Sequence, residues 1–255
     1  MLRAERQDRL IRFVSEKGIA TVEELIRAAG SSEATIRRDI NELSTRGLLE
    51  KVRGGAKAVT SQTDVPEPSF VIKSQTNAEE KKRIAREAVK LISPGEQIML
   101  DSGTTTYALA CELGIFQDLK IVTNDLRIAL EISTNTSNKV VFLGGAIRDG
   151  FCSSYGYYAE AMLRNISADK IFLSIDALDP VMGIMSYTMD DVNLKILGMK
   201  NARETYVLAD HSKFESRPLF SAGMLDQIDT VISGTELPVE KAEELAEAGL
   251  KVIRV

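Results

Sequence analysis

The sequence predicts an α/β protein with two domains: a small, mainly helical head and a larger domain built on a mostly parallel sheet. One amphipathic helix with a basic outer face, near residues 32–46, predicts the head. Short apolar strands that alternate with helices from residue 77 onward predict the second domain. Charge divides the chain in the same place: residues 1–60 carry a net charge of +3, and residues 61–255 carry −8.

The basic helix begins after Ser32, whose hydroxyl is suited to capping the first turn. Ile36, Ile40 and Leu43 then form one apolar stripe, and Gly47 is expected to end the helix. The opposite face is small, polar and cationic, and consists of Ala34, Thr35, Arg37, Arg38 and Asn41. A helix with these two faces suits the major groove of DNA, so we expect it to be a recognition helix.

The surrounding sequence completes a winged helix-turn-helix over residues 1–57. Helices are expected at residues 3–16 and near Val22 and Leu25, followed by a turn at Gly30. Residues 48–53 are strand-like, and the two glycines that follow turn the chain back as a small wing. Phosphate contacts are expected from Lys51, Arg53 and Lys57. The alternative is a three-helix bundle with a solvated basic face.

Composition narrows the class of protein. The net charge of −5 excludes a uniformly basic nucleic-acid coat, and no apolar signal-peptide core or membrane-spanning run is present. Cys111 and Cys152 lack metal-ligand spacing and are expected to be reduced thiols of a cytoplasmic protein. His211 is the single histidine, which excludes a catalytic triad built on another histidine, and we expect it to be a packing residue. We expect no metal, no cofactor and no catalytic residue.

Residues 58–76 contain Pro66 and Pro68 without a persistent periodicity, so we expect a linker. Residues 77–255 then form the predicted α/β domain. Helices are expected at 79–92, 104–113, 125–132, 155–165, 189–202 and 239–248. Strands are expected at 97–100, 119–122, 139–143, 170–174, 205–208, 230–232 and 251–253. Short buried strands in this alternation predict a mostly parallel sheet covered on both faces.

Polar side chains collect where these strands end, which is where open parallel sheets bind ligands. The expected binding residues are Asp101, Ser102, Gly103, Thr104, Thr105, Thr106, Thr123, Asn124, Gly144, Gly145, Asp176, Lys195 and Lys213. The turn at 101–106 leads into a helix N-terminus, which favours an anion. Hydroxyl, amide, carboxylate and ammonium groups together suit a phosphorylated sugar or polyol. No dinucleotide or P-loop glycine motif is present.

The chain resembles the DeoR family of sugar-metabolism regulators. The matching motifs are EELIRAAGSSEATIRRDINELSTRGLLEKVRGGA in the head, and DSGTTT at 101–106, VTN at 122–124, LGG at 143–145, LK at 194–195 and LADHSKF at 208–214. The resemblance implies a sensor domain with a fold like ribose-5-phosphate isomerase, and repression of sugar or polyol operons that phosphorylated intermediates relieve. It places Ala34, Thr35, Arg37 and Arg38 on operator DNA. It places Asp101, Gly103, Thr104, Thr105, Asn124, Gly145, Lys195 and Lys213 around the effector.

Two positions depart from the family pattern: Ala177 stands where a glycine is common, and Asn193 stands where an acidic residue is common. These departures leave open a sugar acid or a polyol phosphate as the effector.

Three functions compete at this stage. The first is a repressor gated by a phosphorylated carbohydrate, with no enzymatic activity. The second is a retained sugar-phosphate isomerase, in which Asp176 and Asp179 supply acid–base groups. The third is a DNA-binding module with an inert body. Because a head of net charge +3 binds DNA weakly alone, we expect a homo-oligomer, either dimer or tetramer. Both induction and co-repression remain open.

Overall fold

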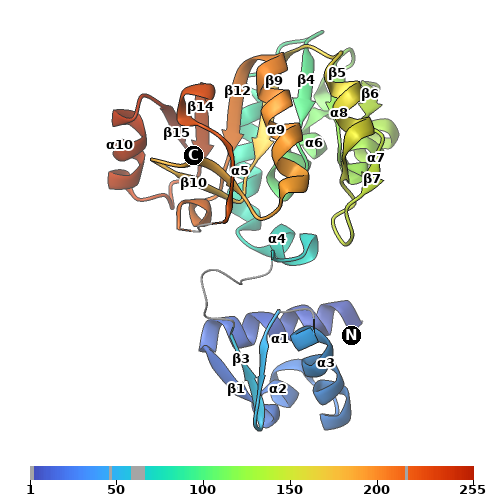
Figure 1. Cartoon of the computed structure of the whole chain (residues 1–255), viewed down its shortest axis with the longest axis vertical. Coiled ribbons are helices and arrows are strands. Elements are labelled where there is room, and N and C mark those ends of the chain that lie inside the picture. Colours follow the sequence, from blue (N-terminus) through green and yellow to red (C-terminus); the bar gives the residue numbers. More distant parts are fainter. Residues whose placement is uncertain (1–2, 46–47, 59–66, 216–217) are drawn as a thin grey trace. The chain divides into compact units, whose positions relative to one another are not determined.

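The computed structural model describes residues 3–45, 48–58, 67–215 and 218–255. The chain forms two compact units, residues 1–72 and 73–255 (Figure 1). Within the described residues, no helix is both long enough and apolar enough to cross a bilayer. The expected helix end at Gly47 lies outside the described residues.

The N-terminal unit is the expected helix-turn-helix with a wing. Its elements are α1 (Arg3–Lys17), β1 (Ile19–Thr21), α2 (Val22–Ala29), α3 (Glu33–Thr45), β2 (Glu50–Val52) and β3 (Gly55–Lys57). Ile36, Ile40 and Leu43 are buried, as the apolar stripe predicts. The strand β1 was not expected, because three residues are too short to show alternation; it makes the wing three-stranded, in the order β1-β3-β2.

A buried polar clamp joins α1 to α3 inside this unit. The Asp39 side chain is 1 % exposed and accepts hydrogen bonds from Arg6 Nε at 2.6 Å and Gln7 Nε2 at 3.2 Å. Asp39 lies on the recognition helix, so the clamp fixes that helix against α1. A carboxylate in this position looks like an ordinary surface residue in the sequence.

The C-terminal unit is a seven-stranded, fully parallel sheet in the order β15-β14-β12-β9-β4-β5-β6. Its strands are β4 (Gln97–Leu100), β5 (Lys120–Thr123), β6 (Lys139–Phe142), β9 (Ala168–Ser174), β12 (Ala202–Leu208), β14 (Thr230–Ser233) and β15 (Lys251–Arg254). All seven match the predicted strands to within a few residues. Along the chain, β5 and β6 therefore extend the sheet on one side of β4. The later strands, β9, β12, β14 and β15, extend it on the other side.

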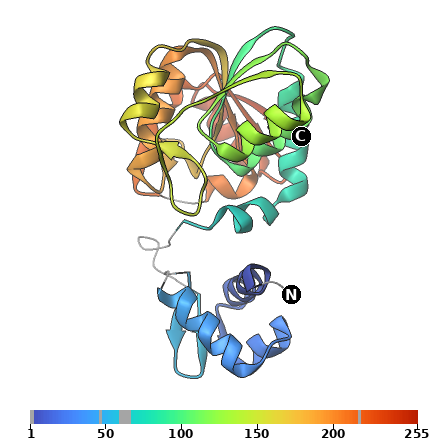
Figure 2. The same cartoon turned by 90° about the vertical axis from the view of Figure 1, so that its right-hand side faces the viewer.

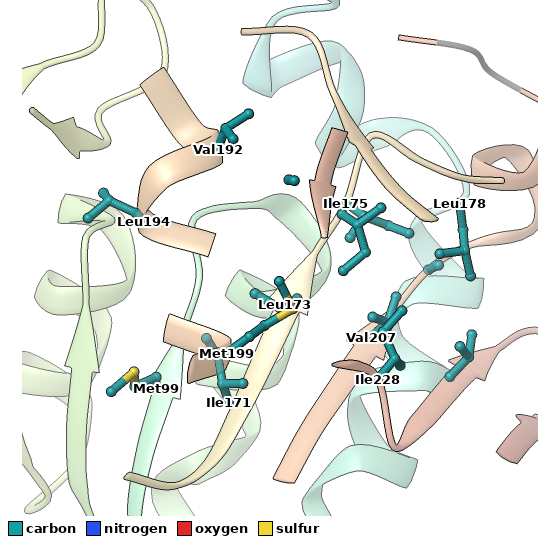
Figure 3. Packing of buried hydrophobic residues seen from close by; sticks show 14 of the residues in the cluster. Met99, Ile171, Leu173, Ile175, Leu178, Val192, Leu194, Met199, Val207 and Ile228 are labelled. Atoms are coloured by element: carbon teal, nitrogen blue, oxygen red, sulfur yellow. The ribbon is translucent and has the colours of Figure 1, made fainter. Parts of the chain in front are cut away.

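Helices cover both faces of this sheet (Figure 2). The helices are α5 (Ala78–Val89), α6 (Thr104–Glu112), α7 (Leu126–Asn135), α8 (Tyr157–Leu163), α9 (Met189–Asn201) and α10 (Val239–Glu247). One core packs α5, α6 and α7 against the sheet, through residues such as Ile84, Leu109 and Ile128. The other packs α8 and α9 against the opposite face, where Met199 of α9 lies beside Leu173 of β9 (Figure 3).

Several short elements were not expected from the sequence. A three-stranded antiparallel sheet is formed by β10 (Ala177–Asp179), β11 (Gly183–Ser186) and β13 (Phe220–Gly223), and a small hairpin by β7 (Ala146–Ile147) and β8 (Ser154–Tyr155). Single 3-10 turns occur at η1 (Leu113–Ile115), η2 (His211–Phe214) and η3 (Leu225–Gln227). The predicted linker also contains a helix, α4 (Phe70–Gln75), so residues 58–76 are not all irregular.

We predict that Asp39→Ala destabilises the N-terminal unit by about 1.5–3 kcal/mol, because the Arg6 and Gln7 donors lose a charged acceptor. Urea unfolding followed by circular dichroism measures the loss. Glu33→Ala on the exposed side of the same helix is the control and should change stability little. Equal stability of wild type and Asp39→Ala would show that the clamp is energetically silent.

Candidate functional site

The recognition face of α3 is exposed, as expected. Ala34, Arg37, Arg38 and Asn41 are exposed, and Thr35 is half-buried at the edge of the face. Ser32 caps the helix, because its Oγ accepts a hydrogen bond from the Thr35 backbone N–H at 3.4 Å. The face is therefore available to a ligand, while the opposite side of the helix holds the core.

Wing and helix side chains are joined to one another across this surface. Lys51 Nζ on β2 donates to Asn41 Oδ1 at 2.6 Å, and Arg37 Nε donates to Glu33 Oε1 at 2.8 Å. Lys57 Nζ lies 3.7 Å from Glu50 Oε2. Arg53 is exposed in the turn between β2 and β3. Exposed pairs of this kind are weak, so these cations can exchange their partners for DNA phosphates.

The strand order places the predicted ligand site at one particular edge of the sheet. The direction of strand addition reverses between β4 and β9, and the crevice beyond the carboxyl ends of such a strand pair is where open α/β sheets bind ligands. Asp101 follows β4 directly, and Asp176 follows β9 by two residues. Two carboxylates that lie 75 positions apart in sequence thus follow neighbouring parallel strands of the sheet.

Lys195 joins the two strand ends. Its ammonium forms a buried ion pair with Asp101 and donates to the Ser174 carbonyl oxygen at 2.8 Å. Burial raises the pKa of Asp101 to about 6, although Lys195 opposes the shift. Burial also lowers the pKa of Lys195, but the Asp101 and Asp191 carboxylates outweigh it and the net shift is upward. A cavity of about 20 Å³ lies beside this pair, enough for about one water molecule.

Asp176 is held by a lysine that the sequence analysis did not select. Lys73 Nζ donates to Asp176 Oδ1 at 2.6 Å, and the Tyr187 backbone N–H donates to Oδ2 at 3.3 Å. Burial alone raises the pKa of Asp176, but Lys73, with Lys213 and Lys195, lowers it to about 2. Asp176 is therefore an anion surrounded by ammonium groups.

The turn after β4 is packed more tightly than a free phosphate loop. A Cβ added at Gly103 would lie 2.2 Å from Ser174 Cβ, so a glycine is needed where these two strand ends meet. Ser102 Oγ donates to Asp125 Oδ2 at 2.8 Å. Thr104, Thr105 and Thr106 are all buried. The turn at 101–106 thus holds neighbouring strand ends together at the base of the crevice.

The ends of β5 and β6 are engaged with the β7–β8 hairpin. Thr123 Oγ1 accepts from the Asp125 backbone N–H at 3.1 Å, and Asn124 Nδ2 donates to the Ser154 carbonyl oxygen at 3.2 Å. A Cβ at Gly145 would lie 2.5 Å from the Tyr155 carbonyl oxygen, whereas a Cβ at Gly144 would make an ordinary contact with Met162 Sδ at 4.0 Å. These contacts give the side chains a local structural role beside any part in ligand binding.

The end of β12 brings a third set of charged groups to the same edge. Asp210 accepts from Asn77 Nδ2 at 2.8 Å, and Lys81 Nζ lies 3.5 Å from its second oxygen. Lys213 follows in η2, and its ammonium helps to hold the pKa of Asp210 below its usual value, against the effect of burial. The structure thus brings Asp101, Asp176, Lys195 and Lys213 together at one edge.

His211 is a pairing residue in this part of the molecule. Its backbone N–H donates to Glu80 Oε1 at 2.8 Å, and its Nδ1 lies 2.7 Å from Glu80 Oε2. Glu80, Asp210 and His211 offer oxygen and nitrogen atoms within 4.8 Å of one another, which is a spacing that a metal ion could bridge. Both Glu80 oxygens are engaged by His211, and Asp210 Oδ2 lies 3.5 Å from Lys81 Nζ.

Sequence reasoning missed several charged residues near this edge, among them Lys73 and Arg148. Arg148 is 9 % exposed, pairs with Asp191 at 2.7 Å and lies over the Phe151 ring at 4.1 Å. Neither residue belongs to a motif or to a periodic segment of the sequence. Their positions follow from the hairpin and from α4, which the sequence patterns do not predict.

A winged helix-turn-helix joined to an α/β unit with a polar crevice defines a DNA-binding regulator with its own sensor. The comparisons agree: residues 6–62 match the DeoR-like helix-turn-helix domain, and residues 76–235 match the DeoR C terminal sensor domain. The chain belongs to the DeoR family of transcriptional regulators.

Relatives align over nearly their whole length. The chain is 34 % identical to the HTH-type transcriptional regulator GlpR of Haloferax volcanii, over 99 % of this chain and 98 % of that one. It is 32 % identical to a putative aga operon transcriptional repressor of Escherichia coli O157:H7, over 99 % and 94 %. It is 30 % identical to the glycerol-3-phosphate regulon repressor of Escherichia coli K12, over 97 % of each chain.

Similarities to solved structures are weaker. Ribose 5-phosphate isomerase A from Methanocaldococcus jannaschii aligns at 21 % identity and a TM-score of 0.41, over 55 % of each chain. The probable sor operon regulator from Shigella flexneri aligns at 14 % identity and a TM-score of 0.45, over 80 % of this chain and 97 % of that one.

We predict that the His211–Glu80 pair makes stability depend on pH. Burial opposes protonation of His211, but the Glu80 carboxylate outweighs it and raises its pKa above the usual 6.5. A raised pKa in the folded state stabilises the fold fully below about 6.5, and this contribution is lost as pH rises through the raised value.

The comparison is between wild type and His211→Gln, each unfolded with urea at pH 6 and pH 9. The free-energy difference between the two proteins should be larger at pH 6. Other charged groups nearby, such as Lys81 and Asp210, are present in both proteins. Their contribution to the free energy of unfolding therefore cancels in the difference. A difference that does not vary with pH would show that folding leaves the pKa of His211 unchanged.

Proposed function

We propose that this regulator represses genes for carbohydrate utilisation, and that a phosphorylated sugar or polyol bound at the β4/β9 crevice releases it from its operator. The observation that carries the proposal is the gathering of ammonium and carboxylate groups at this edge, from five separate segments of the chain. The names of the relatives support the chemical class, because they include a glycerol-3-phosphate regulon repressor.

The DNA contacts are assigned by exposure and charge. We propose that Ala34, Thr35 and Arg38 on α3 face base edges, and that Ser32, Arg37, Asn41 and the wing residues Lys51, Arg53 and Lys57 contact the backbone or flank it. Arg38 is exposed and points away from the buried stripe of the same helix. It is therefore the side chain whose removal should affect DNA binding without affecting the fold.

The effector contacts divide by charge. We propose that the ligand phosphate lies near Lys213 and the N-terminus of α6, where ammonium groups and backbone N–H groups favour an anion. The carboxylates of Asp101 and Asp176, with Asn124, then accept hydrogen bonds from sugar hydroxyls. Lys195 is engaged with Asp101 before any ligand binds, so we assign it the role of positioning that carboxylate.

We propose that the sensor binds its ligand without turnover. The isomerase alternative requires Asp176 and Asp179 to act as paired acid–base groups. Asp179 instead accepts the Val181 and Met182 backbone N–H groups at 2.8 and 2.9 Å, in the turn between β10 and β11. Asp176 is paired with Lys73 and has a pKa near 2, which suits an anion and not a general acid.

The first test concerns DNA. We predict that Arg38→Ala weakens operator binding by about 1–3 kcal/mol if the guanidinium reads a guanine, and leaves the melting temperature unchanged. The operator is first selected from random duplex DNA with the wild-type protein, and affinity is then measured at fixed salt. Arg127→Ala in the sensor unit is the matched control. An unchanged affinity would remove Arg38 from the groove.

The second test concerns the effector. We predict that Lys213→Ala still binds the operator but needs a higher concentration of phosphorylated carbohydrate for release, by about tenfold or more, because a charge-assisted contact is lost. Glycerol 3-phosphate, pentose phosphates and hexose phosphates are titrated into the operator complexes. The exposed Lys200→Ala is the control. Identical release curves for both variants and wild type would place the phosphate elsewhere.

The third test concerns assembly. We propose a homo-oligomer held by the sensor unit, which lets two or more weak heads bind one operator. Exposed apolar side chains along β6, α7 and α8 support this, namely Leu130, Val141, Tyr157 and Tyr158. Sedimentation velocity of the full chain at micromolar concentration should show a dimer or tetramer. A monomer at that concentration would contradict the proposal.

A further inference from the structure

The sensor crevice already contains an ammonium group from the chain itself. Lys73 lies on α4, and its side chain is 16 % exposed. Its Nζ donates to Asp176 Oδ1 at 2.6 Å and lies 5.8 Å from the Phe151 ring centre and 5.6 Å from that of Tyr187. A cation held by one carboxylate and two aromatic rings occupies a well-formed site. Lys73 thus pairs with one oxygen of the carboxylate that we assign to the sugar.

The end of α4 is also fixed through its backbone. Lys81 on α5 is buried, and its ammonium donates to the carbonyl oxygens of Lys73 and of Thr76, the latter at 2.8 Å. Asn77 turns the chain between the two helices with a φ of 53°, and its Nδ2 donates to Asp210 Oδ1. The elbow between α4 and α5 is therefore fixed to the strand ends after β9 and after β12.

This attachment matters because α4 is short. A helix of six residues is not stable by itself in water, so its position depends on the contacts that hold it. Among the described residues, α4 is the first helix after the wing strand β3, and its residues 70–72 still belong to the N-terminal unit. Lys73 is thus the first residue of the sensor unit, next to the part of the chain that leads to the head.

We propose that Lys73 acts as an internal stand-in for the effector, and that α4 is a latch which opens when a ligand takes over Asp176. The inference rests on the proposed function, since it uses the same crevice. Asp176 is buried, and a buried carboxylate is costly when unpaired, so Lys73 leaves only when another donor replaces it. Ligand hydroxyl groups supply that replacement. The coupling between ligand and DNA then equals the difference in ligand affinity between the latched and unlatched states.

The test uses the full chain without any ligand. Lys73→Met keeps the length and apolar body of the side chain and removes its charge, and Lys73→Arg keeps the charge. Lys82→Met is the matched control, because Lys82 is an exposed lysine of α5 whose Nζ donates to Glu79 Oε1 at 2.7 Å. Two quantities are measured: amide hydrogen exchange in residues 70–77, and affinity for the selected operator duplex.

We expect Lys73→Met to raise amide exchange in residues 70–77. We also expect it to change operator affinity by about fivefold or more, in the same direction as a bound effector changes it. Lys73→Arg should lie close to wild type, and Lys82→Met should match it. Asp176→Asn removes the other partner of the same ion pair and should raise exchange in residues 70–77 as Lys73→Met does. Agreement between the two variants would show that the effect comes from the lost pair and not from a folding defect in one variant.

Faster exchange with an unchanged operator affinity would overturn the latch, because Lys73 would then be a local contact only. Unchanged exchange and affinity would overturn it as well. The proposed function fails separately: it fails if no phosphorylated carbohydrate in the panel alters operator binding by the wild-type protein. If a phosphorylated carbohydrate alters operator binding by the wild-type protein, but Lys73→Met does not change operator affinity, only the latch is refuted.

Discussion

The sensor unit depends on one buried ion pair at the point where its sheet changes direction. Lys195 holds the carboxylate of Asp101 after β4 and the carbonyl of Ser174 at the end of β9, so one side chain from α9 ties together the two central strands. A buried pair of this kind is costly to break, because removal of either partner leaves the other uncompensated. Gly103 is needed at the same place, since a side chain there would meet Ser174. The base of the crevice is therefore rigid.

The rim of the crevice is different, because its charges come from segments that can exchange partners. Asp176 is held by Lys73, and Asp210 by Asn77 and Lys81, all of which lie on or beside the α4–α5 elbow. A rigid base with a rim of replaceable pairs is suited to a sensor, since ligand binding can change the rim without unfolding the sheet. In the other unit, the Asp39 clamp fixes the recognition helix, while the cations of its outer face are in weak, exposed pairs.

Much of the fold can be predicted from the sequence, because buried strands and amphipathic helices leave strong patterns. The Ile36, Ile40 and Leu43 stripe and all seven parallel strands are confirmed. The strand order is not written in any local pattern, and it decides which strand ends meet. The short elements β1, β10 and α4 also lack a periodic signal, so Lys73 lay hidden in a predicted linker. Sequence motifs are enough to predict that Asp101, Lys195 and Lys213 lie at one crevice. The residues that form ion pairs and hydrogen bonds with them are visible only in the structure.

The most direct measurement of the central claim is the chemical reactivity of Lys73 in the wild-type protein. Lysines are labelled with an amine-reactive ester and quantified by mass spectrometry, with and without the phosphorylated carbohydrate that alters operator binding. Lys82, which is exposed on α5, is the internal reference. Displacement from Asp176 predicts that labelling of Lys73 rises while that of Lys213 falls and that of Lys82 stays constant. Protection of Lys213 with no change at Lys73 would contradict the account.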